Sequence, residues 1–290
     1  MKKIILLGFI FSCFISFGQA GSEIFLFDLK IIHNQVILSN GKNITQHTGY
    51  DNQPFFHPSK PFIYYSSFND SGRSDIKYYD YQKNKISDLN NTPEREYSPT
   101  VTPDGKFISC IIQRDNGVQD LGKYPVKGGQ PVLVIKDLKV GYHAWIDKDK
   151  LLLFVLIDSA TNNLHYYNLT TKKDTVIVSN PGRSLHKIPG QHAMSFIQKS
   201  KGKDWIIKRV DITTGAISTI VPALPGEENL VWLKNNIIVM SSGNKLFSYQ
   251  VGLDKEWQPV IIEGDISLLK GLSRLATNIG NTKLALVVSE

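Results

Sequence analysis

The stretch YSPTVTPDGKFISCIIQ, Tyr97–Gln113, decides the fold of this chain. Two short apolar runs that are typical of strands lie on either side of Pro103-Asp104-Gly105. Asp-Gly between such runs predicts a tight hairpin, because glycine adopts a positive φ without steric cost. Weaker copies of the pattern occur at Gln53–Ser67 and Arg274–Ser289, so the hairpin is a repeated unit.

A second kind of strand also recurs, and each copy ends in an acidic or amide residue. Its clear copies are SEIFLFD, SDIKYYD, NNLHYYN, DWIIKRVD and NKLFSYQ, which close at Asp28, Asp80, Asn168, Asp211 and Gln250, and a degenerate copy closes at Val126. The copies are spaced roughly 40 to 50 residues apart, a period typical of the four-stranded blades of a β-propeller. Helical periodicity is nearly absent, which indicates an all-β chain.

The repeat predicts five complete blades in the middle of the chain. They cover Tyr50–Leu89, Tyr97–Ile135, Tyr142–Val178, Arg183–Val221 and Asn229–Ile262. The N-terminal part supplies only a third strand at Glu23–Leu29 and an outer strand within Val36–Thr45, and the C-terminus supplies only an inner and a second strand. Either half alone would leave an unpaired strand edge. We therefore predict a six-bladed β-propeller whose ring is closed by N-terminal and C-terminal strands that share one blade.

The first 20 residues have the pattern of a secretory signal peptide. Lys2-Lys3 precede the apolar stretch Ile4–Phe17, and Gly18-Gln19-Ala20 has the small-x-small pattern of a cleavage site. We predict a signal peptide at 1–20, a propeller at 21–290, and a periplasmic or secreted protein with no stable membrane span after cleavage. An uncleaved anchor and lipid attachment at Cys13 are the alternatives.

The charge distribution bears on the kind of partner, and the cysteine content bears on whether a disulfide can form. The formal net charge of the full chain is +7, but the lysines are scattered singly at expected turns. A nucleic-acid-binding protein gathers its basic residues on one stripe, so we expect no nucleic-acid partner. After the signal only Cys110 remains, so no intramolecular disulfide can form.

Two stretches resemble the PD40 repeat, a WD40-like unit of TolB-like propellers. They are ITQHTGYDNQPFFHP, Ile44–Pro58, and EYSPTVTPDGKFISCI, Glu96–Ile111. The resemblance implies an exported six-bladed propeller. TolB proteins carry an α/β domain before the propeller, whereas here a strand begins at Glu23, so the chain is expected to lack that domain.

In a propeller, the first residues of the innermost strands surround one mouth of the central channel, where ligands commonly bind. Aligning the hairpins makes Gln53, Ser98, His143, Ser184, Asn229 and Ser273 equivalent. From these positions and the two residues before each, we predict a ligand-binding or partner-binding mouth formed by Asp51, Gln53, Glu96, Tyr97, Tyr142, His143, Arg183 and Glu228. A solvated rim whose polar groups only satisfy loop backbone is the alternative.

The sequence contains no GxSxG elbow and no HExxH or HxH motif. We therefore predict a non-enzymatic binding module or scaffold without a cofactor, whose partner is an envelope or secreted protein or a peptide segment, with a carbohydrate as a second candidate. The alternative is a propeller enzyme, a glycoside hydrolase, lyase or lactonase, that uses rim carboxylates on a sugar or lactone. Such an enzyme could also use a divalent cation in the channel, held by His143 or His186 with Glu96 or Glu228.

Overall fold

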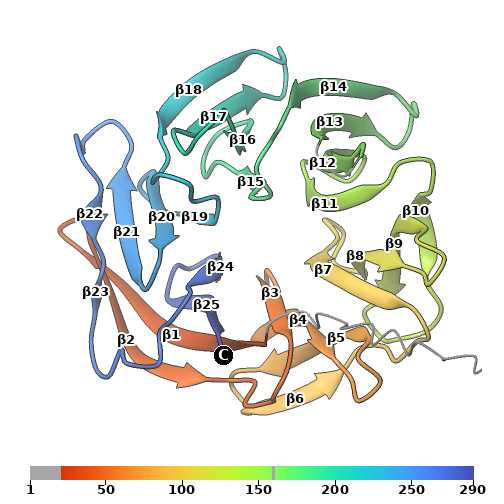
Figure 1. The fold of residues 1–290 in the computed structure, drawn as a ribbon, viewed down its shortest axis with the longest axis horizontal. Helices are drawn as coiled ribbons and strands as arrows, with labels where there is room; N and C mark the ends of the chain where they lie inside the picture. The colour runs from red at the N-terminus through yellow and green to blue at the C-terminus, as the bar shows by residue number, and fades with distance from the viewer. Residues whose placement is uncertain (1–20, 159–160) are drawn as a thin grey trace, which may run out of the picture.

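The computed structural model describes residues 21–158 and 161–290, and every regular element in them is a β-strand. The strands form six sheets arranged as blades around a central axis (Figure 1). The chain is therefore a six-bladed β-propeller, as the repeat predicts. The expected signal peptide and Cys13 lie outside the described residues. Within the described part of the chain, no helix is long and apolar enough to cross a membrane.

Each of the first three blades is a four-stranded antiparallel sheet. Blade 1 contains β3 (Asp51–Phe56), β4 (Phe62–Phe68), β5 (Ser74–Asp80) and β6 (Lys85–Asp88). Blade 2 contains β7 (Arg95–Val101), β8 (Phe107–Gln113), β9 (Gln119–Pro125) and β10 (Val132–Ile135). Blade 3 contains β11 (Val140–Trp145), β12 (Lys150–Leu156), β13 (Asn162–Asn168) and β14 (Asp174–Ser179).

Blades 4 and 5 repeat this order with shorter inner or outer strands. Blade 4 contains β15 (His186–Lys187), β16 (Ala193–Gln198), β17 (Ile206–Asp211) and β18 (Ile217–Pro222). Blade 5 contains β19 (Leu230–Leu233), β20 (Ile237–Ser242), β21 (Lys245–Gln250) and β22 (Gln258–Pro259). In every blade the inner strand faces the axis and the last strand lies at the circumference (Figure 1).

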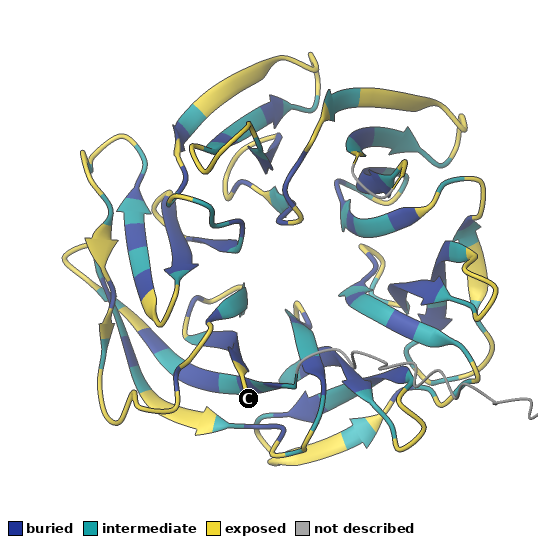
Figure 2. Ribbon diagram, viewed as in Figure 1, coloured by how far each residue is buried: buried dark blue, intermediate teal, exposed yellow. Residues whose placement is uncertain are grey.

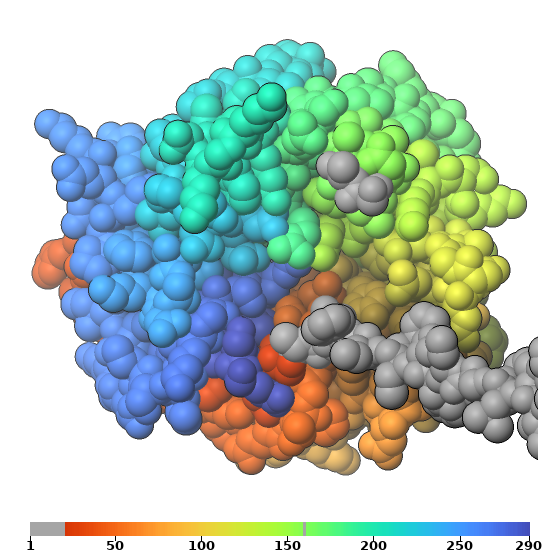
Figure 3. Space-filling view, viewed as in Figure 1, coloured from red at the N-terminus to blue at the C-terminus, as the bar shows by residue number. Residues whose placement is uncertain are grey.

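Blade 6 closes the ring and draws on both ends of the chain. It contains β24 (Ser273–Thr277), β25 (Lys283–Ser289), β1 (Ser22–Ile32) and β2 (Gln35–Asn43). β1 and β25 pair antiparallel with Phe25 opposite Leu286. Figure 3 shows the first and last parts of the described chain side by side on one face. The predicted closure by a shared blade is confirmed.

The edge of this blade differs from the prediction. Ile261–Ile262 form β23, which pairs parallel with Ile37 and Leu38 of β2 as a fifth strand. The assignment of Ile262 to blade 5 is therefore wrong. The chain leaves β22 and crosses to the next sheet, and β23 thereby covers part of an edge of β2 that would otherwise be unpaired.

The hydrophobic core is divided among the interfaces between blades. Each apolar cluster joins two neighbouring sheets, and one of them joins blade 6 to blade 1 through Ile24, Leu26, Phe56 and Ile63. The second strand of each blade is buried along its length, whereas outer strands such as β14 and β18 are largely exposed (Figure 2). The inner strands are thus held rigidly from behind, and their first residues form the walls of the channel.

The hairpin of the deciding stretch forms as expected. Gly105 has a φ of +68°, and the Asp104 carboxylate accepts a hydrogen bond from the Thr102 hydroxyl at 2.6 Å. In blade 5, where Pro-Asp-Gly is missing, Asn235 and Asn236 adopt φ values of +60° and +57°. Asparagine tolerates this region better than most residues, so the hairpin survives without the motif.

Candidate functional site: the mouth of the channel

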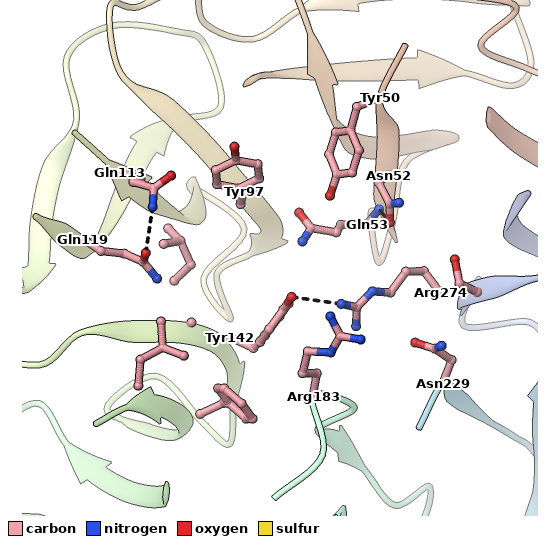
Figure 4. A pocket seen from close by; sticks show the side chains of 15 residues that line it. Tyr50, Asn52, Gln53, Tyr97, Gln113, Gln119, Tyr142, Arg183, Asn229 and Arg274 are labelled. Carbon is pink, nitrogen blue, oxygen red and sulfur yellow. Dashed lines mark hydrogen bonds between the residues drawn. The ribbon is translucent and has the colours of Figure 1, made fainter. Parts of the chain in front are cut away.

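A cavity of about 560 Å³ lies at one mouth of the channel. We call it the mouth cavity. Its wall includes residues that come from, or directly precede, the inner strands of all six blades: Asn52, Tyr97, Tyr142, Arg183, Asn229 and Arg274 (Figure 4). Its volume falls in the range of about 300–1,000 Å³ that is typical of ligand pockets. A single ligand in the mouth cavity would therefore contact every blade.

A smaller chamber of about 130 Å³ lies next to the mouth cavity. The two spaces share four lining residues, Gln53, Tyr142, Arg183 and Arg274, which we call the collar. The smaller chamber has room for about four water molecules at about 30 Å³ each. The collar is therefore the place where the two spaces meet.

Two arginines approach the same tyrosine in the collar. Arg274 Nη2 donates a hydrogen bond to the Tyr142 hydroxyl oxygen at 2.9 Å (Figure 4). The guanidinium carbons of Arg274 and Arg183 lie 4.9 and 5.9 Å from the centre of the Tyr142 ring. Burial would raise the pKa of the Tyr142 phenol, but the positive charges of Arg274 and Arg183 outweigh it and lower this pKa.

Arg183 is held by a buried carboxylate. Its Nε donates to Glu228 Oε1 at 2.5 Å, and its backbone N–H donates to Glu228 Oε2 at 3.1 Å. Lys199 Nζ lies 2.7 Å from the same carboxylate. Burial would raise the pKa of Glu228, but the charges of Arg183 and Lys199 prevail and lower it to about 2. Glu228 is therefore ionised at neutral pH and fixes Arg183 in the wall.

The rest of the wall is uncharged and offers amides and aromatic rings. The amide side chains are Asn52, Gln53, Gln113, Gln119 and Asn229. The Gln53 Oε1 atom accepts a hydrogen bond from the backbone N–H of Ser98 at 2.7 Å, which ties blade 1 to blade 2. Tyr50 and Tyr97 pack edge to face with ring centres 6.4 Å apart. Such a wall can hydrogen-bond to a peptide or sugar and stack on apolar groups.

No protein-family model matches this sequence, and no curated protein matches it significantly. Several solved structures, however, have a similar fold. A putative TolB from Agrobacterium tumefaciens is 13% identical, with a TM-score of 0.71 over 94% of this chain and 99% of that chain. TolB from Acinetobacter baumannii is also 13% identical, with a TM-score of 0.57, and this chain covers 93% of itself but spans only 64% of that protein. A chain of a nidogen/laminin complex is 7% identical, with a TM-score of 0.62 over 92% of this chain and 98% of that chain.

The chain has a TolB-like propeller fold. At these identities the likeness concerns the fold alone. Fold does not fix function, so the function of this TolB-like propeller has to be argued from the residues of its own mouth.

The predicted site residues separate into three groups in this TolB-like ring. Gln53, Tyr97, Tyr142 and Arg183 line the mouth cavity. His143 lines the smaller chamber, where its Nε2 lies 2.7 Å from the Ser109 hydroxyl. Burial lowers the pKa of His143 to about 3, so its ring is neutral at pH 7.

The three predicted carboxylates are buried and are not among the residues that line the two spaces. Glu96 accepts hydrogen bonds from the Thr92 and Tyr124 hydroxyls at 2.6 and 2.8 Å, and burial raises its pKa in spite of them. Asp51 is buried beside His47, with 3.6 Å between Nδ1 and Oδ2, and burial raises its pKa to about 6. Glu228 neutralises Arg183.

This placement bears on the enzymatic alternative. Two carboxylates that flank a glycosidic bond are needed for most glycoside hydrolysis, and among the described residues that line the mouth cavity none is acidic. In residues 21–158 and 161–290, no three His, Cys, Asp or Glu side chains come close enough together to hold a metal ion. The described wall therefore offers amides, aromatic rings and two arginines, and no carboxylate.

Arg274 is the collar residue that the hairpin alignment misses. β3, β7 and β24 each contain a bulge, where Gln53, Ser98 and Arg274 adopt φ values of +59°, +55° and +36°. The structural equivalent of Gln53 is therefore Arg274, one residue beyond the predicted Ser273. The bulge adds one residue to the strand and so shifts which side chain faces the channel.

Proposed function

We propose that this chain is an exported binding module that holds a segment of an envelope or secreted protein in the mouth cavity. The TolB-like propeller fold is compatible with a binding or scaffold role. The observation that carries the proposal is the composition of the mouth cavity, a wall of amides, tyrosines and two arginines contributed by six blades. An extended peptide presents backbone donors and acceptors at regular intervals, and side-chain amides can pair with both.

Rigidity supports the same proposal. The residues of the wall lie in or near inner strands, which pair with buried second strands such as β4 and β8. The ring is closed by the pairing of β1 with β25. A preformed site loses little conformational entropy on binding, which favours recognition of a flexible segment. Export is part of the proposal and rests on the N-terminal sequence pattern.

The test is to fill the mouth cavity and measure peptide binding. Ser273 lines the cavity, and Ser218 in β18 is an exposed serine at the circumference. A displayed random peptide library is selected on the wild-type protein, and the selected peptides are then measured against Ser273→Trp and Ser218→Trp. We expect Ser273→Trp to weaken binding at least tenfold and Ser218→Trp to leave it within twofold.

The outcome that contradicts the proposal is equal binding by the two variants, which would place the ligand elsewhere on the ring. Thermal unfolding of both variants is the control for folding. A library that yields no peptide, while a panel of oligosaccharides binds in a manner sensitive to Ser273→Trp, would replace the peptide by a carbohydrate.

A further inference from the structure

The charges around the mouth cavity are unevenly distributed between its wall and the layer behind it. Arg183 and Arg274 line the cavity, and the described lining contains no acidic residue. Arg183 is neutralised by Glu228, but that carboxylate also neutralises Lys199. Arg183 and Lys199 carry two positive charges and Glu228 carries one negative charge. The group therefore has a net positive charge, to which Arg274 adds another.

Arg274 has no ion pair with any described residue. Its hydrogen-bond acceptor is the Tyr142 hydroxyl, and both guanidinium groups lie near the Tyr142 ring. The guanidinium group carries five N–H donors, so most of them remain available to a ligand. Figure 4 shows the side chains of both arginines converging on the same part of the cavity.

The position of the pair within the cavity matters as much as its charge. Both arginines belong to the collar, which lines both the mouth cavity and the smaller chamber of about 130 Å³. A ligand in either space therefore has both guanidinium groups in its wall. The local positive potential is also expressed in the lowered pKa of the Tyr142 phenol.

We propose that the collar is a carboxylate-binding subsite, in which Arg274, assisted by Arg183 and the Tyr142 hydroxyl, receives a carboxylate of the bound segment. This inference rests on the proposed function and specifies which chemical group the segment presents. A planar guanidinium binds a carboxylate through two parallel N–H···O hydrogen bonds, and such charge-assisted pairs are the strong ones. The carboxylate comes from an Asp or Glu side chain or from a free C-terminus.

The backbone of Arg274 is consistent with a binding role. A non-glycine residue at a φ of +36° is strained, and strained residues cluster at binding sites, where the surrounding structure holds them in place. Here the bulge between Ser273 and Leu275 holds the residue and brings its side chain to the channel wall. Glycine would adopt this φ without strain, so the needs of the sheet do not explain an arginine at this position.

The test uses four pools of N-acetylated tetrapeptides, whose residues are uncharged except for the one Asp or Lys named below. The first pool has an amidated C-terminus, the second a free C-terminal carboxylate, the third one Asp and an amidated end, and the fourth one Lys and an amidated end. Retention of each pool is measured by affinity selection and mass spectrometry on wild type, Arg274→Gln, Arg274→Lys, Ser273→Trp and the control Arg209→Gln. Arg209 lies in β17, contacts Asp211 and does not line the cavity.

On the wild type we expect at least one of the two carboxylate pools to be retained about 10- to 100-fold more strongly than the neutral amidated pool. Whether the free-C-terminus pool or the Asp pool is favoured identifies the source of the carboxylate. Arg274→Gln is expected to abolish the preference, Arg274→Lys to keep part of it, and Arg209→Gln to keep all of it.

Two results would overturn the inference, and they differ in what else they affect. If the neutral or Lys pool is retained as strongly as the carboxylate pools, and Ser273→Trp reduces that retention, the binding module stands but the carboxylate subsite is wrong. If no pool is retained in a manner sensitive to Ser273→Trp, the proposed function fails, and the subsite fails with it.

Discussion

The wall of the mouth cavity and the layer of side chains behind it carry opposite charges. The wall presents Arg183 and Arg274 among amides and tyrosines. Behind it lie Asp51, Glu96 and Glu228, all buried. The three acids come from blades 1, 2 and 5 and the two arginines from blades 4 and 6, and the folded ring places the acids behind the wall and the arginines in it.

This difference teaches that carboxylates at a propeller mouth need not be ligand-binding groups. Each has a structural partner: Glu228 holds Arg183 and Lys199, Glu96 accepts two hydroxyl hydrogen bonds, and Asp51 lies beside His47. Arg274 is the charged group of the wall that the described acids leave uncompensated. The carboxylates therefore support the wall, and Arg274 is available for binding.

The largest effect on stability is expected from removing the charge behind the wall. Glu228→Gln leaves Arg183 and Lys199 without their shared carboxylate. Breaking a buried ion pair on one side costs about 3–5 kcal/mol, and we expect the lower end, about 3 kcal/mol, because the Arg183 side chain is 42% exposed. Urea unfolding at pH 7 measures this.

Arg274→Gln is the matched variant in the wall, and it should change the free energy of unfolding by less than about 1 kcal/mol, since one hydrogen bond is lost. Equal destabilisation by the two substitutions would show that both arginines are structural, and the contrast between wall and layer would be lost.

A smaller effect, with a distinctive pH dependence, is expected at Asp51. Its pKa is about 6 in the folded chain against an ordinary value of 3.8, so the folded state binds more protons between these values. Stability should therefore fall as the pH rises from about 4 to about 6. Asp51→Asn should lack this fall and be about 2 kcal/mol more stable than wild type at pH 7.

The pH dependence of stability that Glu228 contributes has the opposite sign to that of Asp51, so the two buried carboxylates can be compared directly. Its pKa is about 2 when folded against 4.5 ordinarily, so its contribution is present above pH 4.5 and is lost as the pH falls toward 2. Stability curves from pH 3 to 8 for Asp51→Asn and Glu228→Gln should therefore depart from wild type in different pH ranges. A parallel shift at all pH values in both variants would contradict the assigned protonation states.

The smallest effect is expected from the strained backbone of an inner strand at the smaller chamber. Ser98 holds a φ of +55°, a conformation that costs a non-glycine residue about 1 kcal/mol. Ser98→Gly should stabilise the ring by about 0.5–1 kcal/mol in urea unfolding. A loss of stability would mean that the Ser98 side chain contributes more than the strain costs.

The sequence predicts the fold further than it predicts the site. Repeated hairpins and two complementary half-blades are sufficient to predict the ring, and the pairing of Phe25 with Leu286 confirms its closure. The excursion of Ile261–Ile262 into the neighbouring sheet could not be predicted, because a two-residue strand has no periodicity to detect.

At the mouth, the prediction from sequence misses which side chain lines the collar by a single residue. A bulge adds one residue without any composition signal, and in β24 it lets Ser273 and Arg274 both line the cavity. This is why Arg274 is missed in favour of Ser273. Asp51 and Glu96 are buried for a different reason: successive side chains of a strand face opposite sides, and each acid directly precedes a cavity-lining residue, Asn52 or Tyr97.

The most direct measurement is a crystal structure of residues 21–290 with a tetrapeptide from the best retained carboxylate pool. We predict that the peptide lies in the mouth cavity and that its carboxylate is within hydrogen-bonding distance of the Arg274 guanidinium, beside Arg183 and Tyr142. A peptide bound on the outer strands, or one that lies in the cavity with its carboxylate directed into solvent away from the collar, would contradict the account.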